Sequence, residues 1–86
     1  MARIIDGEAK NIVGDQVRAI RVSKRMSQQE LADQLELLAI YVCRGSISRL
    51  EDKQRTVTDM ELYGIAKVLD VPITKLFPQN AEEESS

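Results

Sequence analysis

Apolar residues recur with helical spacing along much of the chain, and the clearest stripe lies between residues 58 and 72. Its members are Leu62, Ile65, Ala66 and Leu69. The spacing of i, i+3, i+4 and i+7 puts four side chains on one face of a helix. Thr58 and Glu61 form a capping box before the stripe, and Pro72 disfavours helical backbone in the residue before it. The pattern predicts a buried helix that opens after Thr58 and ends at residues 71–72.

A similar signal stands earlier in the chain, at Ser27 and Glu30. The Ser27 hydroxyl can accept from the amide of Glu30, and the carboxylate can accept from the amide of Ser27. Leu31, Ala32 and Leu35 follow on one helical face. We expect a helix that opens here and buries these side chains, with the small Ala32 allowing close approach of a neighbouring helix.

The segment before this helix predicts another, which is amphipathic and basic. Asp15 is its candidate cap, and the helix is expected to run to about Lys24. The apolar face holds Val13, Val17 and Ile20, and the basic side chains expected at or near the surface are Arg18, Arg21 and Arg25. A basic face of this kind is either simply solvated or a binding surface for anions.

Two shorter helices complete the pattern. Ile47 and Leu50 predict a helix that begins near residues 43–45 and ends about residue 52, and residues 73–77 predict a fifth. Only residues 40–42 resemble a strand. A chain of 86 residues buries about 60% of its unfolded surface, which is enough for one small core. The expected fold class is therefore all-α, with five short helices in one domain.

The charge is unevenly distributed. The chain carries −2 overall, yet residues 1–55 hold ten basic side chains against eight acidic ones, a local net of +2. From residue 56 onward, two lysines stand against six acids, and three of these acids form the run 82–84. We predict that residues 79–86 are an acidic, disordered tail. The overall negative charge therefore does not exclude a phosphate-binding surface in the first half.

Residues suited to catalysis or metal binding are scarce. The chain has no His, the commonest general base and metal ligand, and its single Cys allows neither an intrachain disulfide nor a multi-cysteine cluster. We expect no enzyme, no metal and no cofactor. The N-terminus has no run of about 7 to 15 apolar residues behind a basic start, as a signal would need, and the longest apolar run, at 37–43, has only seven residues, too few to span a membrane. A cytoplasmic protein without membrane contact is expected.

Two of the expected helices carry a sequence match beyond periodicity. The first opens with Ser-Gln-Gln-Glu-Leu-Ala at 27–32, and the second reads Ser-Ile-Ser-Arg-Leu-Glu at 46–51. Together with the segment around 61–71, these motifs resemble the helix-turn-helix of the phage Cro/repressor-like (XRE) family. The resemblance implies a five-helix, lambda-repressor-like DNA-binding domain at 14–78, preceded by an N-terminal arm at 1–13.

The resemblance implies that the helix around residues 44–52 reads the major groove. The candidate base-reading residues are Arg44, Gly45, Ser46, Ser48 and Arg49. An arginine can pair with O6 and N7 of guanine, and Gly45 would let the backbone approach the duplex. For Arg49 the alternative is a surface ion pair with Asp52 or Glu51. The register of Arg44 depends on the turn before it.

Phosphate contacts are expected near helix ends, where free amides and the helix dipole favour an anion. The candidates are Lys24, Arg25, Ser27, Gln28, Gln29, Lys53 and Arg55. Gln28 can also touch a base edge. Arg21 and Glu51 match a salt bridge of the family and are assigned to structure.

Three features depart from the family pattern. Residues 36–45 form a longer connection than usual, and we interpret 37–42 as an expanded turn or helix extension. It is expected to pack on the core, with Tyr41 or Leu38 as the alternative of an exposed partner surface. Cys43 replaces a capping Ser or Thr; we expect a weak cap and a packed thiol. Lys53 replaces a Gly, and a positive φ there would cost on the order of 1 kcal/mol.

The expected function is a sequence-specific transcriptional regulator, most simply a repressor, that binds a double-stranded operator as a homodimer. Ile73, Leu76 and Phe77 either finish the core or form the dimer contact. One alternative is an antitoxin or restriction-controller protein of the same fold, with a protein partner. Another is a protein-interaction module that has lost DNA binding, as the acidic total and Cys43 would allow. The acidic tail is a solubilising segment or an inhibitor of DNA binding.

Overall fold

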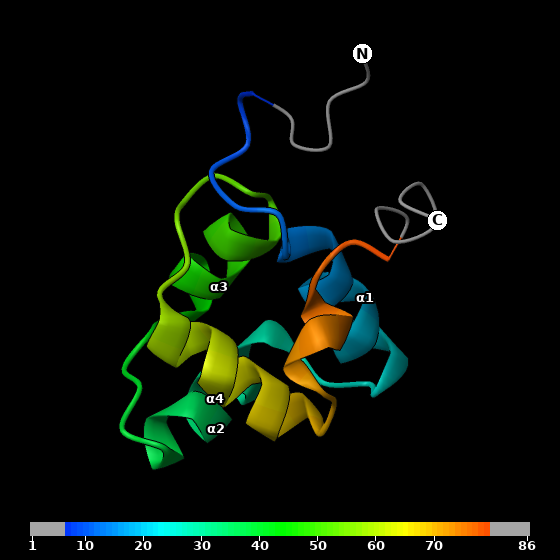
Figure 1. Cartoon of the computed structure of the whole chain (residues 1–86). Coiled ribbons are helices and arrows are strands. Elements are labelled where there is room, and N and C mark those ends of the chain that lie inside the picture. The colour runs from blue at the N-terminus through cyan, green and yellow to red at the C-terminus, as the bar shows by residue number, and fades with distance from the viewer. Residues whose placement is uncertain (1–6, 80–86) are drawn as a thin grey trace.

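The computed structural model describes residues 7–79, which form four α-helices and one short 3-10 helix around a common core (Figure 1). In chain order these are α1 (Gly14–Ser23), α2 (Gln28–Leu37), α3 (Arg44–Glu51), α4 (Asp59–Leu69) and η1 (Ile73–Leu76). No strand forms among the described residues, and the segment 40–42 is irregular. The all-α prediction is confirmed. The parts of the predicted arm and acidic tail at 1–6 and 80–86 lie outside the described residues.

The core is built from one face of each helix. Its completely buried large side chains are Val17, Leu31, Leu35, Ile47, Leu50, Ile65, Leu69 and Leu76. Helix α2 packs against both α3 and α4, while α1 contacts α3 and η1. The apolar stripes predicted from spacing are the faces that meet in this core, so the stripes of α2 and α4 are confirmed.

The predicted fifth helix is shorter and more tightly wound than expected. Instead of an α-helix over 73–77, the chain makes one 3-10 turn at Ile73–Leu76, and Phe77 follows with extended backbone. Pro72 and Pro78 frame this segment. Because prolines lack an amide and the segment is so short, successive i to i−4 hydrogen bonds cannot build up.

Both predicted capping boxes are present. The Glu30 amide donates to Ser27 Oγ at 3.0 Å, and the Ser27 amide donates to Glu30 Oε1 at 2.8 Å. At α4, the Glu61 amide donates to Thr58 Oγ1 at 3.1 Å and the Thr58 amide donates to Glu61 Oε1 at 2.9 Å. The hydrogen bond from the Ser27 amide lowers the pKa of Glu30. These local signals fix where α2 and α4 begin.

The start of α1 differs from the prediction, because Asn11 rather than Asp15 occupies the capping role. Asn11 Oδ1 accepts from the amides of Val13 at 3.1 Å and Gly14 at 2.9 Å. Its Nδ2 donates to the carbonyl oxygen of Leu50 at 3.0 Å, at the end of α3. One side chain therefore closes the first turn of α1 and ties it to α3, which a cap at Asp15 could not do.

Gly14 explains why α1 and α3 meet so closely. A Cβ at this position would lie 2.5 Å from the carbonyl oxygen of Leu50 and 2.8 Å from that of Glu51. Real Cβ atoms do not approach backbone oxygens this closely, so a larger residue would push the two helices apart. The position of α3 therefore depends on a glycine in α1.

All four α-helices end in the same way, with a residue of positive φ that is not glycine. These residues are Arg25 (φ 57°), Ala39 (φ 64°), Lys53 (φ 61°) and Asp70 (φ 57°). In α2 the motif is completed by the Ile40 amide, which donates to the Leu35 carbonyl oxygen at 3.0 Å, and by the Ala39 amide, which donates to Glu36 at 2.9 Å. This is the Schellman pattern that satisfies the last carbonyls of a helix. Lys53, which stands where the family has a Gly, thus does adopt a positive φ.

The long connection after α2 packs on the core at alternate residues only. Ile40 and Val42 are half-buried against the core, whereas Leu37 and Tyr41 are 78% and 76% exposed. The left-handed turn at Ala39 reverses the chain, so residues beyond it cannot continue the buried face of α2. Core packing is therefore wrong for Leu37, while Tyr41 and Leu38 are exposed, as the alternative of a partner surface requires; the expanded turn is confirmed.

Candidate nucleic-acid interface

Helix α3 presents its predicted reading face to solvent. Ile47 and Leu50 are fully buried, and Arg44 and Arg49 are exposed on the outside of the helix. The other three candidate base readers, Gly45, Ser46 and Ser48, are half-buried. The buried and the exposed residues of α3 thus lie on opposite faces of the helix.

Arg49 is not engaged in the ion pair that was its alternative role. Within residues 7–79, no ion pair joins Arg49 to Asp52 or Glu51, and the carboxylate of Glu51 is instead bound by Arg21. The Arg49 guanidinium lies over the first turn of its own helix, with Nη1 3.6 Å from where a Cβ of Gly45 would be. Two parts of the candidate reading face, a guanidinium and a bare backbone position, therefore adjoin.

Cys43 precedes α3 without capping it. Its side chain accepts no cap hydrogen bond, as expected for a thiol, but the residue is exposed, so the expectation of a packed thiol is wrong. The nearby amide of Ser46 lowers the pKa of the Cys43 thiol. The start of α3 therefore has no side-chain cap at Cys43.

A buried polar network holds the far end of α3. Arg21 Nε lies 2.6 Å from Glu51 Oε2 and Nη2 lies 3.0 Å from Oε1, so both groups of the fork are used. Arg21 Nη1 donates to the carbonyl oxygen of Met26 at 2.7 Å, and Gln28 Nε2 donates to Glu51 Oε1 at 3.0 Å. The predicted structural pair is confirmed. Arg21 is buried rather than at the surface of α1 because its charge is matched by Glu51.

Five of the seven candidate phosphate contacts lie at the connection between α1 and α2. Lys24 and Arg25 end α1 with exposed side chains, and Ser27 and Gln29 are exposed at the start of α2. Gln28 is half-buried, and one of its amide hydrogens serves Glu51. Basic side chains therefore adjoin the amino-terminal end of α2, where free amides and the helix dipole favour an anion.

Lys53 lies just after α3, in the left-handed turn that ends the helix. Its Nζ is 3.0 Å from Asp15 Oδ2, and the two side chains are 33% and 78% exposed. Exposed ion pairs of this kind contribute about 0 to 1 kcal/mol because water and salt screen them. Replacing Asp15 by a phosphate as the partner of Lys53 would therefore cost little free energy.

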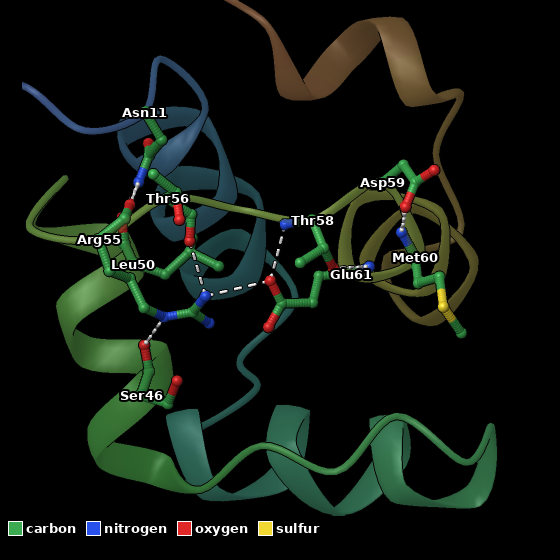
Figure 2. Close-up of polar contacts among 9 residues, drawn as sticks. All are labelled: Asn11, Ser46, Leu50, Arg55, Thr56, Thr58, Asp59, Met60 and Glu61. Carbon is green, nitrogen blue, oxygen red and sulfur yellow. Dashed lines mark hydrogen bonds and ion pairs between the residues drawn. The ribbon is translucent and has the colours of Figure 1, made fainter.

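Arg55 differs from the prediction of a phosphate contact, because its guanidinium is turned inward (Figure 2). Nε donates to the Ser46 carbonyl oxygen at 2.9 Å, and Nη1 lies 3.1 Å from Glu61 Oε1. Nη1 also donates to the carbonyl oxygen of Thr56 at 2.9 Å. Arg55 therefore joins α3 to the start of α4, and the structure gives it a structural role.

Two residues with positioning roles were not identified from the sequence. Asn11 donates to the carbonyl oxygen of Arg55 at 2.9 Å as well as to that of Leu50 in α3. Glu61 Oε1 accepts a hydrogen bond from Arg55 Nη1 (Figure 2). Asn11 stands three residues before Gly14, a spacing typical of Asx turns and caps, so a signal was present. The pairing of Arg55 with Glu61 had no local signal.

The comparisons with known proteins agree with this architecture. The sequence matches the family described as Helix-turn-helix over residues 17–76, and it matches no curated protein. The chain therefore belongs to the XRE-type helix-turn-helix family, whose members bind DNA and are generally not enzymes. Among the described residues, no helix is long and apolar enough to cross a membrane.

Three solved structures are similar over most of their lengths. The restriction-modification controller protein C.AhdI from Aeromonas hydrophila is 28% identical, with a TM-score of 0.67 over 76% of this chain and 91% of that one. The hypothetical transcription factor NHTF from Neisseria is 24% identical, with a TM-score of 0.73, and the match covers 100% of this chain and 95% of that one. The DNA-binding domain of BldD is 24% identical, with a TM-score of 0.67 over 86% and 100%. The family and the fold together define a DNA-binding transcription regulator.

Proposed function

We propose that the protein represses transcription by occupying a specific operator, with α3 in the major groove. The observation that carries the proposal is the contrast between the two faces of α3. One face is fixed by the buried pair of Arg21 and Glu51, and the other presents Arg44 and Arg49 to solvent without ion-pair partners among residues 7–79. A rigid helix with free guanidinium groups is suited to pairing with guanine O6 and N7.

In this proposal Arg44, Gly45, Ser46, Ser48 and Arg49 face the bases. The phosphate contacts are Lys24, Arg25, Ser27, Gln29 and Lys53, with a reduced part for Gln28 and none for Arg55. The proposed target is double-stranded DNA, and the proposed protein is a non-enzymatic regulator that acts in the cytoplasm. A homodimer on a pseudo-palindromic site supplies the affinity that a single small domain lacks.

Selection of binding sites from random DNA tests this directly. We expect one enriched sequence with two related half-sites about one helical turn apart. Arg49→Ala should relax preference at one base pair per half-site, a loss of about 1 to 3 kcal/mol in discrimination. The matched control is Arg18→Ala, which removes the same charge from an exposed position of α1 and should leave base preference unchanged. An unenriched library would refute sequence-specific binding.

The salt dependence of binding tests the phosphate contacts separately. Each contact contributes about −0.9 to the slope of log K against log salt concentration. Arg25→Ala should make the slope less steep by about one per half-site while leaving base preference intact. A slope unchanged by this substitution would remove Arg25 from the interface.

One further candidate function rests on the similarity to C.AhdI, a restriction-modification controller at 28% identity. In such a role the protein would bind the control region of a restriction-modification operon. Binding assays with the DNA upstream of its own gene and its neighbours distinguish this role from regulation of unrelated genes. If this role requires a protein partner, the neighbouring genes are expected to encode it.

A further inference from the structure

An apolar groove of about 700 Å³ runs along the outer side of α4. Its apolar lining is Leu38, Ile40, Met60, Tyr63 and Ile73. None of these residues comes from α3 or from the connection between α1 and α2, so the groove is separate from the proposed DNA-binding surface. Figure 2 shows Met60 and Asp59 on the side of α4 away from Glu61 and Arg55.

The side chains of this groove are unusually open for large apolar residues. Met60 and Tyr63 are 66% and 60% exposed, and Leu38 and Ile73 are 46% and 42% exposed. They form one continuous lining rather than scattered single residues. A contiguous apolar surface rimmed by charge is typical of an interaction site.

The charges along this face of α4 are arranged symmetrically. Asp59, Tyr63 and Lys67 line the same groove at intervals of four residues, which places them along one side of the helix. Lys67 Nζ lies 5.4 Å from the centre of the Tyr63 ring. Within residues 7–79, neither Asp59 nor Lys67 is in an ion pair. An acid thus stands four residues before an exposed tyrosine, and a base stands four residues after it.

We propose that a second copy of this chain occupies the groove, with α4 packed antiparallel to α4 of its partner about a two-fold axis at Tyr63. In that arrangement each Asp59 faces the partner's Lys67, so both ends of the contact are complementary. The two Tyr63 rings meet near the axis, and the partner chain covers Met60 and Leu38 in each of the two chains. This interface is that of the homodimer in the proposed function, and its biological role rests on that function.

This interface differs from the one expected from the sequence. Of the three candidate dimer residues, Leu76 is completely buried in the core and Phe77 is half-buried against it, so both finish the core. Ile73 alone is exposed and lines the groove. The dimer contact therefore moves from the carboxyl-terminal turn to the outer side of α4.

Sedimentation equilibrium of the full chain without DNA, over a wide range of concentration, is the first measurement. We expect a monomer–dimer equilibrium. Tyr63→Ala should raise the dimer dissociation constant by about tenfold or more, as loss of a central aromatic contact does. Tyr41→Ala is the matched control, since Tyr41 is also exposed but lies outside the groove. A chain that stays monomeric at every concentration, or an equal effect of both variants, would overturn the proposal.

A charge exchange tests the antiparallel pairing itself. Asp59→Lys alone or Lys67→Asp alone places like charges opposite each other at both ends and should weaken the dimer by about tenfold. The variant with both substitutions restores opposite charges with reversed polarity and should dimerise nearly as well as the original chain. Because both changes oppose the α4 dipole, harm to the folded monomer would instead make the double variant the weakest. Failure of the double variant to recover, although urea unfolding shows its monomer to be as stable as those of the single variants, would refute this packing.

The outcome is independent of whether the protein binds DNA. If the charge exchange behaves as expected but no DNA sequence is enriched, the interface stands and the proposed function falls. If DNA is bound with two half-sites but the α4 variants leave the dimer unchanged, the function stands and the interface is elsewhere. A small apolar ligand or a different protein in the groove would give the second of these results.

Discussion

Arg21 of α1 and Glu51 of α3 meet in a two-point ion pair, with N to O distances of 2.6 and 3.0 Å and almost no exposure of the Glu51 side chain. The pair lies at the end of α3, while the exposed arginines project from its outer face. Buried ions of this kind determine the orientation of the helices that carry them, because neither ion can lose its partner cheaply.

We therefore expect Glu51→Gln to destabilise the protein strongly. The substitution leaves the Arg21 guanidinium buried without a countercharge, and the expected loss is about 3 kcal/mol in the free energy of unfolding. Urea unfolding at neutral pH measures it. Asp15→Asn removes the exposed partner of Lys53 and serves as the control, with an expected loss below about 1 kcal/mol. Equal losses in the two variants would contradict the structural importance of the buried pair.

The second prediction concerns acid stability and Glu61. Burial raises the pKa of Glu61, but hydrogen bonds from the Arg55 guanidinium and the Thr58 amide outweigh it, and the pKa lies below the ordinary 4.5. Because the folded state holds this proton less readily than the unfolded chain, the stabilisation is complete above about pH 4.5. It is lost as the pH falls through the folded-state pKa.

Urea midpoints measured from pH 7 to pH 3 test this dependence. Glu61→Gln should cost about 2 kcal/mol at neutral pH, where charge-assisted hydrogen bonds are lost, and should flatten the acid limb of the curve. Glu30→Gln changes the equivalent residue of the other capping box, which is exposed, and should keep most of the acid dependence. Identical curves for the two variants would show that Arg55 contributes nothing to the pairing.

The elements that sequence patterns predicted are those specified by neighbours in the chain. The capping boxes at Ser27 and Thr58 and the stripe of α4 involve residues within one or two turns, so spacing alone reveals them. Arg49 and Arg55, by contrast, are the same residue type, and the residues beside each of them do not reveal which guanidinium is ion-paired. The path of the chain between α3 and α4 brings Arg55 to Glu61, whereas Arg49 has no ion-pair partner among residues 7–79.

The choice of cap for α1 illustrates the same limit. Asp15 and Asn11 are both short polar residues that can accept from helical amides. Asn11 is used because its amide nitrogen also reaches the carbonyl oxygens of Leu50 and Arg55, which are 39 and 44 residues away. Such a contact exists only once the tertiary structure has formed, so the local sequence does not distinguish the two.

The third prediction uses the left-handed residue that ends α2. Ala39 is exposed at φ 64°, a conformation that costs a residue with a Cβ about 1 kcal/mol relative to glycine. Ala39→Gly should therefore stabilise the protein by about that amount. The control is Ala19→Gly, an exposed position inside α1, which should lose about 1 kcal/mol. Thermal unfolding of both variants measures the opposite signs; a loss in both would mean that the turn is not strained.

The last prediction contrasts the effects of alanine at Gly14 of α1 and at Gly45 of α3. Gly14→Ala should unfold more easily by about 2 kcal/mol, because its Cβ would meet two backbone oxygens of α3. Gly45→Ala should fold at least as well as the original chain, since the nearest atoms to its Cβ are at ordinary contact distances of 3.6 and 3.9 Å. Yet we expect Gly45→Ala to weaken DNA binding, because the new methyl group lies on the face proposed to meet the duplex.

Binding measured in the Arg49→Ala background identifies the cause of that weakening. If Gly45 matters because the backbone of α3 approaches the DNA, the methyl group reduces affinity to a similar extent whether or not Arg49 is present. If the methyl group acts by displacing the adjoining Arg49 guanidinium, the loss disappears once Arg49 has been removed. The first result supports close approach of α3 to the duplex at Gly45. The second shows that residue 45 affects DNA affinity only through the position of the Arg49 guanidinium. No loss in either background would show that residue 45 lies away from the DNA.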